Sequence, residues 1–440
     1  MANPRNTLIV GTAGRDFHIF NTVYRTDSHH RVLGFTSPQL AHGESSLYPA
    51  CLSGALYPEG IPILPEVDLE PVIAELGIKD VVFAYSELPY AEMHRLGSRV
   101  LAAGADFQLL SPARSMLASS KPVIAVSAAR SGAGKTPTVR YLAHLLHSQG
   151  RRIAVVRHPI VHQTFEDHVS HRVSTGADVD ADECSFSERT EFEPLFADEV
   201  VVFSGLDFAQ ILSAAEAEAD VILWDGGGND LPFIRPDLHI VVTDPLRTGH
   251  DGYFPGEVCL RMADLVIINK CDSATVEQIE GAEAAIDRTN PRAQVLTADS
   301  PVTVEGADLV RGRTVTIVEE GLSLALGALK AGAGLVAAKQ CGVSGIISPR
   351  PNAVGSLVRV YREHPEAHSV LPVMGYTPTQ VAELQATLDA TQSEAIIDAT
   401  RLDLGTVLNV TKPMARAAYA LRPHDPDVLA AAVRAVVDGR

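Results

Sequence analysis

The sequence predicts an α/β protein built on parallel strands. Short apolar runs rich in Val and Ile alternate with longer segments rich in Ala, Leu and Glu along the 440 residues. The short runs are apolar almost throughout, as expected for strands that are covered on both faces. Hydrophobic residues make up 46% and charged residues 20%, which is usual for a globular chain. Together these observations indicate the βαβ rhythm of a doubly wound sheet.

The expected elements alternate along the whole chain. The expected strands are Thr7–Val10, Arg31–Phe35, Val81–Tyr85, Val123–Ser127, Ile153–Arg157, Glu199–Phe203, Val221–Trp224, Leu238–Thr243, Leu265–Asn269, Ala293–Thr297, Thr314–Glu319, Gly345–Ser348, Ser369–Pro372 and Ala395–Asp398. The expected helices include Leu69–Leu76, Tyr90–Ala103, Thr138–Gln149, Phe208–Glu218 and Pro378–Thr387. Parallel strands joined by helices end at one edge of a sheet, where α/β proteins bind their ligands.

Two glycine-rich turns divide the chain. Val10–Gly14 and Ser127–Thr136 each follow a predicted strand, about 120 residues apart, which is the size of a small domain. Ser111–Lys121 carries the prolines and serines of a linker. We therefore expect three regions: a Rossmann-like α/β domain at 1–118, a doubly wound domain at 119–311, and a C-terminal α/β extension of that domain at 312–440.

Composition excludes several classes. The 36 Lys and Arg residues against 54 Asp and Glu give a formal net charge of −18, whereas a nucleic-acid partner requires a basic face. No apolar run reaches about 18 residues, so no membrane partner is expected. Five scattered cysteines without a CxxC pair, and an N-terminus without signal-peptide features, favour a reducing cytoplasm. An acidic chain that binds a small anion must gather its basic residues locally.

The most informative motif follows the strand Val123–Ser127. The loop after it ends in Gly132-Ala-Gly-Lys-Thr136 and leads into a predicted helix, which is the pattern of a P-loop. Such glycines let backbone N–H groups turn toward phosphates, and the helix adds its positive end. Lys135 is expected to reach the β- and γ-phosphates, and the Thr136 hydroxyl to bind Mg²⁺. The remaining nucleotide-binding residues expected in this loop are Ser131, Gly132, Ala133 and Gly134.

Two positions of the loop depart from the usual pattern. Ala129 stands where a P-loop normally has glycine, which is tolerated if φ stays negative there. Arg130 stands where the deviant Walker A class carries a signature lysine. We expect Arg130 to assist Lys135 in stabilising the transferring phosphoryl group, which needs charge neutralisation above all.

A second nucleotide motif is predicted at the end of the strand Val221–Trp224. Asp225 follows this apolar strand as a Walker B aspartate does, and is expected to hold Mg²⁺ together with Thr136. Gly226–Asp230 is then a glycine-rich switch loop. Its Asn229 or Asp230 is expected to position a nucleophile or acceptor.

A base-reading motif follows the strand Leu265–Asn269. Asn269, Lys270 and Asp272 form the N-K-x-D pattern of GTPases, in which the aspartate accepts the guanine N–H groups. ATP-using P-loop proteins of this class also carry an asparagine at this strand end. The sequence therefore predicts Mg²⁺ with ATP or GTP and leaves the base open.

Further charged residues lie where an anionic acceptor would bind. Arg157 and His158 end a predicted strand, where the arginine fork binds phosphate or carboxylate and the histidine transfers a proton. Glu188 and Glu191 belong to an acidic run that would hold a second metal ion or act as a base, or else forms a solvated face. Arg350, between two prolines, would bind an anionic substrate or only stabilise the turn.

The N-terminal glycine turn is the last candidate. Arg15 and His18 follow Gly11–Gly14 at an expected helix start and would bind an anionic part of the acceptor. A purely structural domain is the alternative. NAD is not expected, because the second strand runs into Thr36–Pro38 without the acidic residue that binds ribose.

These motifs together resemble the family of cyclic 2,3-diphosphoglycerate synthetases, of the deviant-Walker (SIMIBI) P-loop class that also includes metallochaperone GTPases. The resemblance covers nearly the whole chain and implies ATP-driven closure of 2,3-bisphosphoglycerate, one phosphate being activated and the other attacking it. Its supporting stretches include Gly11–His18, Leu56–Ile63, Arg157–Pro159, Trp224–Asp230, Asp244–Pro245 and Tyr253–Glu257. The chain departs from the family pattern at Ala325–Gly327, Ser348–Pro351 and Ile160–Gln163, so a different acceptor is open.

We therefore expect a cytoplasmic Mg²⁺-NTP-dependent synthetase or ligase that phosphorylates an anionic small molecule for cyclisation or ligation. The acceptor would lie between the P-loop domain and the Rossmann-like domain. The alternative is a regulatory or metallochaperone-type GTPase that acts on a protein partner; an NTP-binding protein with little catalysis is a third reading. A homodimer is compatible with the sequence.

Overall fold

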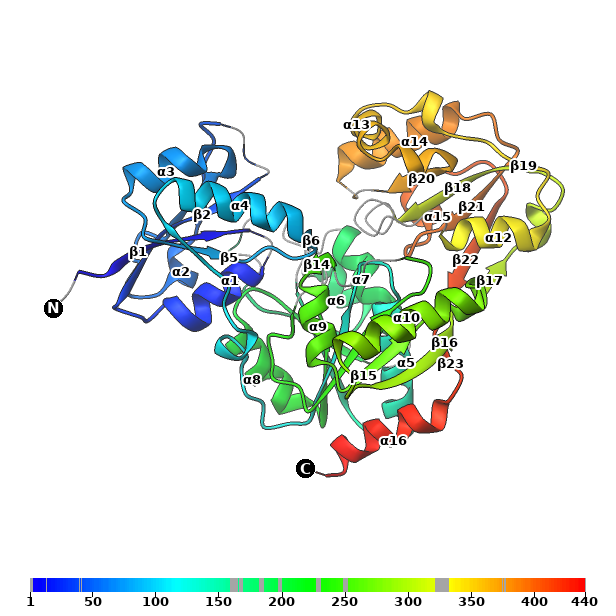
Figure 1. Cartoon of the computed structure of the whole chain (residues 1–440). Helices are drawn as coiled ribbons and strands as arrows, with labels where there is room; N and C mark the ends of the chain where they lie inside the picture. Colours follow the sequence, from blue (N-terminus) through cyan, green and yellow to red (C-terminus); the bar gives the residue numbers. More distant parts are fainter. Residues whose placement is uncertain are drawn as a thin grey trace.

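The computed structural model describes residues 3–12, 14–38, 40, 42–158, 165, 169–181, 186–196, 200–226, 231–247, 252–320, 332–373, 375 and 377–439. Within these ranges lie three large sheets, which follow one another along the chain (Figure 1). No helix in the same ranges combines the length and the apolar character that a membrane crossing needs.

The N-terminal unit contains a six-stranded sheet (Figure 1). Its order is β3 (Ser46–Tyr48), β4 (Ile61–Pro65), β2 (His30–Ser37), β1 (Arg5–Val10), β5 (Asp80–Phe83) and β7 (Asp106–Gln108). All neighbours are parallel except β3 and β4. The parallel strands thus stand in the order third, second, first, fourth, fifth, which is Rossmann-like.

Helices cover both faces of this sheet. They are α1 (Arg15–Ile19), α2 (Ala50–Ser53), α3 (Leu69–Glu75) and α4 (Tyr90–Ala102). Leu8 and Val81 pack with α3 and α4 on one face, whereas Ile9 and Val82 pack with α1 on the other. The alternation of neighbouring residues between two apolar layers explains why these strands are apolar throughout.

The second unit is a nine-stranded sheet. Its order is β10 (His171–Val173), β11 (Val201–Ser204), β9 (Ile153–Arg157), β12 (Val221–Asp225), β8 (Val123–Ala128), β13 (Leu238–Thr243), β15 (Leu265–Ile268), β16 (Gln294–Asp299) and β23 (Arg422–Pro423). The strands from β11 to β16 are mutually parallel, and the two outer strands are antiparallel to their neighbours. The predicted doubly wound sheet is confirmed.

Helices pack on both faces of the nine-stranded sheet as well. They include α5 (Lys135–Ser148), α6 (Gly176–Ala181), α7 (Phe186–Phe196), α8 (Phe208–Glu218), α9 (Gly256–Met262), α10 (Val276–Thr289) and α16 (Pro426–Val437). In β8, Ile124 and Val126 pack with α5 and α16, whereas Val123 and Ala125 pack with α8. Every residue of β8 is buried, so the strand that leads into the P-loop is rigidly held.

The third unit has a sheet of its own. Its order is β17 (Val302–Glu305), β22 (Met414–Tyr419), β21 (Ala395–Ala399), β18 (Thr314–Glu320) and β19 (Gly345–Ile346), with β20 (Val370–Val373) also paired to β18. Its helices are α12 (Ala333–Cys341), α13 (Ser356–Glu363), α14 (Pro378–Ala390) and α15 (Leu404–Val407). The sequence predicts that residues 312–440 extend the P-loop domain. In the structure most of them build this separate sheet, and only β23 and α16 return to the nine-stranded one.

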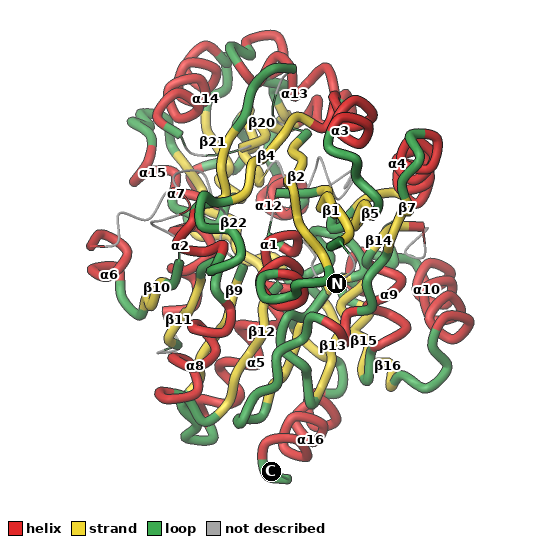
Figure 2. Tube along the Cα trace, turned by 90° about the vertical axis from the view of Figure 1, so that its left-hand side faces the viewer, coloured by secondary structure: helices red, strands yellow, loops and turns green. Residues whose placement is uncertain are grey.

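The N-terminal and second units meet through a short antiparallel ribbon. β6 (Leu88–Pro89) of the first pairs with β14 (Tyr253–Phe254) of the second. Figure 1 shows β6 and β14 beside each other between the two units. α1 lies near the end of β9 (Figure 2), where a Cβ on Gly14 would come within 1.2 Å of Nε2 of His158, so the two units meet at this strand end.

Candidate active site

The P-loop lies between β8 and α5 as predicted. Gly134 has a φ of +122°, and a Cβ there would lie 2.2 Å from Nδ2 of Asn269, so only glycine fits. Ala129 does not have a positive φ; among the described residues other than glycine, Glu87 and Lys270 do. This negative φ explains why alanine is accepted where the common pattern has glycine.

Three charged side chains gather at the ends of β8, β9 and β12. Asp225 is fully buried; Arg157 bonds to its Oδ2, and the Lys135 Nζ lies 4.0 Å from its Oδ1. The Arg157 side chain is itself only 3% exposed. This arrangement brings together the predicted phosphate lysine, the Walker B aspartate and one of the two residues expected at the end of β9.

The residues at this point fit Mg²⁺. Oδ1 of Asp225 is buried and has no hydrogen-bond partner among the described residues, so it can bind a cation. Thr136 follows Lys135 in the first turn of α5 and offers a hydroxyl. Carboxylate and hydroxyl oxygens are ligands that Mg²⁺ prefers, and nucleotide phosphates complete such sites. Mg²⁺ held here would neutralise charge on the phosphates.

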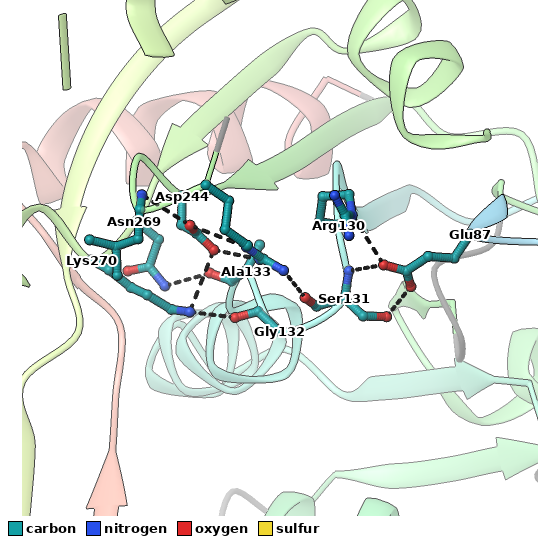
Figure 3. A network of polar contacts seen from close by, with 10 residues as sticks. Glu87, Arg130, Ser131, Gly132, Ala133, Asp244, Asn269 and Lys270 are labelled. Atoms are coloured by element: carbon teal, nitrogen blue, oxygen red, sulfur yellow. Dashed lines mark hydrogen bonds and ion pairs between the residues drawn. The ribbon is translucent and has the colours of Figure 1, made fainter. Parts of the chain in front are cut away.

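Two residues of the base-reading motif form hydrogen bonds to backbone carbonyls of the P-loop (Figure 3). Asn269 is buried and donates from Nδ2 to the Ala133 carbonyl at 2.9 Å. Lys270 has a φ of 62° and donates from Nζ to the Gly132 carbonyl at 2.6 Å. Burial lowers the pKa of Lys270, while the Asp244 carboxylate 3.5 Å away acts in the opposite direction. The two predicted residues therefore hold the carbonyl groups of Gly132 and Ala133 in the loop.

Asp272, the third residue of that motif, is exposed. Its Oδ1 accepts the Ser300 backbone N–H at 3.2 Å. The carboxylate that would read guanine is thus held by the chain after β16, and the choice between ATP and GTP stays open.

Two contacts of the P-loop have no counterpart in the sequence motifs. Arg247 donates to the Ser131 carbonyl at 2.7 Å and to Asp244 at 2.5 Å. Glu87, from the N-terminal unit, accepts the Ser131 backbone N–H at 2.7 Å and lies 3.5 Å from Nε of Arg130 (Figure 3). Sequence reasoning missed Glu87 because no motif surrounds it. The sequence feature that could have indicated Glu87 is its position in the loop directly after the predicted strand Val81–Tyr85.

The predicted acceptor residues lie in several parts of the structure. Arg15 and His18 are buried on α1 at the junction of the two units, and the Arg15 guanidinium lies 4.9 Å from the Phe254 ring centre. His158 is buried against Gly14. Asn229, Asp230 and the side chain of Glu191 lie outside the described residues.

The other two acceptor candidates lie on different elements. Glu188 is 5% exposed on α7. Arg350 is exposed in a short 3₁₀ helix, Arg350–Asn352, of the third unit, and none of its described contacts joins it to the P-loop. The roles of all these residues stay predictions.

His18 packs as an uncharged ring. It bonds through Nε2 to the Ser115 carbonyl at 2.8 Å, and its ring stacks on Phe233 with centres 4.0 Å apart. Burial lowers its pKa to about 3, so at neutral pH it carries no charge for an anionic acceptor.

This lowered pKa predicts a pH-dependent stability. Unfolded histidine binds a proton near pH 6.5, so the stabilisation by neutral His18 is complete above that pH and is lost as the pH falls toward 3. We expect wild type to lose about 1 kcal/mol more per pH unit than His18→Gln below pH 6.5. Urea unfolding of both proteins at pH 7 and pH 5 measures this, and equal slopes would contradict it. His239, whose pKa is lowered to about 4, contributes equally to both proteins.

Gly14→Ala is expected to disrupt the junction of the two units. Gly14 has a φ of +131°, and a Cβ there would lie 1.2 Å from Nε2 of His158. Gly104, at φ +90°, has nothing within 4 Å of its Cβ position, so Gly104→Ala carries the backbone cost alone. We expect Gly14→Ala to lower the free energy of unfolding by about 2 kcal/mol more than this control. Equal losses in urea unfolding would show that the His158 contact does not require glycine.

Comparison with known proteins decides the family. Residues 198–298 match the family model of the P-loop domain of cyclic 2,3-diphosphoglycerate synthetase. Over 418 residues the chain is 45% identical to arginine synthetase ArcE of Thermococcus kodakarensis, which covers 95% of this chain and 93% of the relative. The chain belongs to the ArcE family of P-loop synthetases. It is therefore an enzyme of the NTP-using synthetase class, as the residues predicted.

Other relatives are more distant from this ArcE-family chain. Cyclic 2,3-diphosphoglycerate synthetase of Thermococcus sibiricus is 31% identical over 107 residues, which is 23% of this chain and 24% of that protein. The predicted resemblance to that family is thus confirmed. The structure of LpxK from Aquifex aeolicus in complex with ATP matches 73% of this chain and 90% of its own, with a TM-score of 0.44 and 15% identity.

Proposed function

We propose that this ArcE-family chain is an NTP-dependent arginine synthetase that activates its acceptor by phosphorylation. The observation that carries the proposal is the likeness to ArcE over 95% of the chain, at 45% identity. Lys135, Asp225 and Arg157 at the strand ends supply the charges that phosphoryl transfer needs. The N-terminal unit faces these strand ends and would hold the acceptor.

The chemistry of the product defines the acceptor. Arginine differs from the ureido amino acid citrulline by one nitrogen in place of the ureido oxygen. That oxygen is a poor leaving group until a phosphoryl group is attached to it. Ammonia then forms a bond to the ureido carbon, the C–O bond breaks, and inorganic phosphate leaves with the former ureido oxygen. The balanced reaction is citrulline, ammonia and NTP to arginine, NDP and phosphate.

The residues have separate roles in this proposal. Lys135 and Arg130 would stabilise the transferring phosphoryl group, and Asp225 with Thr136 would hold Mg²⁺. His158, buried beside Arg157 at the end of β9, would move a proton at the acceptor. Arg15 is the candidate for the acceptor carboxylate.

Closure of 2,3-bisphosphoglycerate is the second candidate reaction. The likeness to that synthetase is limited to 23% of the chain, and the matching family model covers residues 198–298 of the P-loop unit. Shared phosphoryl-transfer machinery with a different acceptor accounts for this pattern. A homodimer, a cytoplasmic location and the domain limits 1–118, 119–311 and 312–440 stay predictions.

Isotope-labelled turnover tests the proposal. The protein is incubated with Mg²⁺ and ATP or GTP, with citrulline labelled with ¹⁸O in the ureido group, and with ammonium; a parallel reaction contains 2,3-bisphosphoglycerate. We expect arginine, and ¹⁸O in the released phosphate. A cyclic product from 2,3-bisphosphoglycerate would reassign the acceptor. NTP hydrolysis at a rate that neither metabolite changes would favour a regulatory GTPase.

A further inference from the structure

Glu87 brings a carboxylate of the N-terminal unit into the P-loop. Its Oε1 accepts the Ser131 backbone N–H at 2.7 Å, and its Oε2 accepts the Ser131 hydroxyl. The Arg130 Nε lies 3.5 Å from the same carboxylate. The side chains of Glu87 and Arg130 are only 4% and 5% exposed, so these contacts are shielded from water.

The position of Glu87 is fixed by its neighbours. Glu87 has a φ of 52°, which is uncommon outside glycine and persists where the surroundings dictate it. The next two residues form β6 and pair with Tyr253 and Phe254. Arg130 lies 3.5 Å from the Tyr253 ring centre, and Tyr90 donates to Glu257 at 2.8 Å. The position of the Glu87 carboxylate is therefore determined by the strand pairing and side-chain contacts between the two units.

The donors that Glu87 uses are those that a phosphate uses. A backbone N–H of a glycine-rich loop, a hydroxyl and a guanidinium form a common anion-binding set. One N–H donates one strong hydrogen bond, so Ser131 cannot serve the carboxylate and a phosphate at once. Two anions in a site shielded from water also repel each other strongly.

The place of Ser131 in the P-loop indicates which end of a nucleotide it would meet. The amides next to the N-terminus of α5, from Gly134 onward, are placed for the inner phosphates. Ser131 lies upstream of these glycines and beside the N-terminal unit, which would hold the acceptor. A terminal phosphate must reach this side of the loop, because phosphoryl transfer occurs between nucleotide and acceptor.

We propose that Glu87 is a positioning residue that the terminal phosphate of a nucleoside triphosphate displaces from Ser131, so that the N-terminal unit responds to a triphosphate and not to a diphosphate. The inference rests on nucleotide use by the P-loop and is independent of which acceptor is phosphorylated. Release of Glu87 loosens the segment that carries β6 at the moment when the acceptor must approach the phosphate.

Glu87→Gln tests the competition between the two anions. Glutamine keeps the shape and can still accept the Ser131 N–H, but it carries no charge. We expect the Kd of a non-hydrolysable Mg²⁺-ATP analogue to fall about tenfold, and the Kd of Mg²⁺-ADP to change less than twofold. Both are measured by titration calorimetry, with GTP and GDP analogues in parallel. Glu92→Gln, which removes an exposed carboxylate five residues later on α4, is the matched control and should change neither Kd.

Each other outcome overturns the proposal. Weaker triphosphate binding would mean that Glu87 supports the nucleotide, and equal tightening for both nucleotides would mean that the contact does not concern the terminal phosphate. An unchanged Kd would mean that the carboxylate does not compete. These results say nothing against arginine synthesis, which the labelled assay tests separately.

Hydrogen exchange gives a second measurement that does not depend on a variant. In the wild type, the amides of Ser86, Glu87, Leu88 and Tyr90 and of Tyr253 and Phe254 are expected to exchange at least fivefold faster with the triphosphate analogue than with the diphosphate. Equal exchange with both nucleotides would overturn the displacement of Glu87.

Discussion

Lys135→Ala is expected to lower kcat for NTP turnover between a hundredfold and a thousandfold. Lys135 begins α5, and its ammonium lies 4.0 Å from Asp225 at the point where the phosphates would bind. Arg157 is bonded to Asp225 and Lys270 to the Gly132 carbonyl, so neither of these two cations can take its place. The transferring phosphoryl group then loses the positive charge of Lys135, and Arg130 replaces only part of it.

Phosphate release under saturating Mg²⁺-NTP and acceptor measures this effect. Lys339→Ala, an equivalent change on an exposed position of α12, is the control and should keep wild-type turnover. Urea unfolding shows whether each variant is folded. Turnover of Lys135→Ala within fivefold of wild type would refute the assignment of the P-loop lysine.

Asp225→Asn is expected to lower both stability and activity. Its carboxylate is fully buried and bonded to a guanidinium that is 3% exposed, and loss of one partner of a buried ion pair costs about 3 kcal/mol of the free energy of unfolding. The same change removes the carboxylate expected to hold Mg²⁺, so the Mg²⁺ concentration for half-maximal turnover should rise at least tenfold.

The same pair of strands contains a matched control. Asp220 precedes β12 and bonds to Arg152, which precedes β9, at 2.7 Å. Both side chains face water, with exposed fractions of 67% for Arg152 and 34% for Asp220, so Asp220→Asn should shift the urea midpoint far less. Equal losses for both variants would show that burial of the Arg157 pair is not responsible.

A double variant separates the two effects of Asp225. Arg157→Gln combined with Asp225→Asn removes both charges and should recover most of the lost stability. It should not recover turnover, because the metal-binding carboxylate is still absent. Recovery of both would mean that Asp225 serves only to neutralise Arg157.

Local pattern predicted most of the strands, because a strand covered on both faces is apolar at every position. Each predicted strand overlaps an observed one; β8, for example, spans Val123–Ala128 against the predicted Val123–Ser127. Strands without a continuous apolar run were missed, among them the edge strands β10 and β23 and the inner strand β22. β22, Met414–Tyr419, has the sequence Met-Ala-Arg-Ala-Ala-Tyr, whose small and charged residues give no strand signal.

The sheet to which a strand belongs is not encoded locally. Thr314–Glu319 was predicted as a strand, but nothing in its apolar pattern shows that it pairs with β20 and β21 and not with the P-loop sheet. The return of the chain through β23 and α16 depends on contacts of Leu429 and Val433 with the second core. Such partners are separated by hundreds of residues and are selected only when the cores form.

The sequence by itself determined the chemistry of the nucleotide site. A P-loop needs its glycines, Lys135 and Thr136 in consecutive positions, so the spacing alone identifies it. The tertiary structure decided which distant charges surround that loop. Glu87 lies 44 residues before Ser131, and Arg247 lies 116 residues after it; both reach the loop only because separate strands end beside it. Hydrogen bonds act over a few ångströms in space, whatever the distance along the chain.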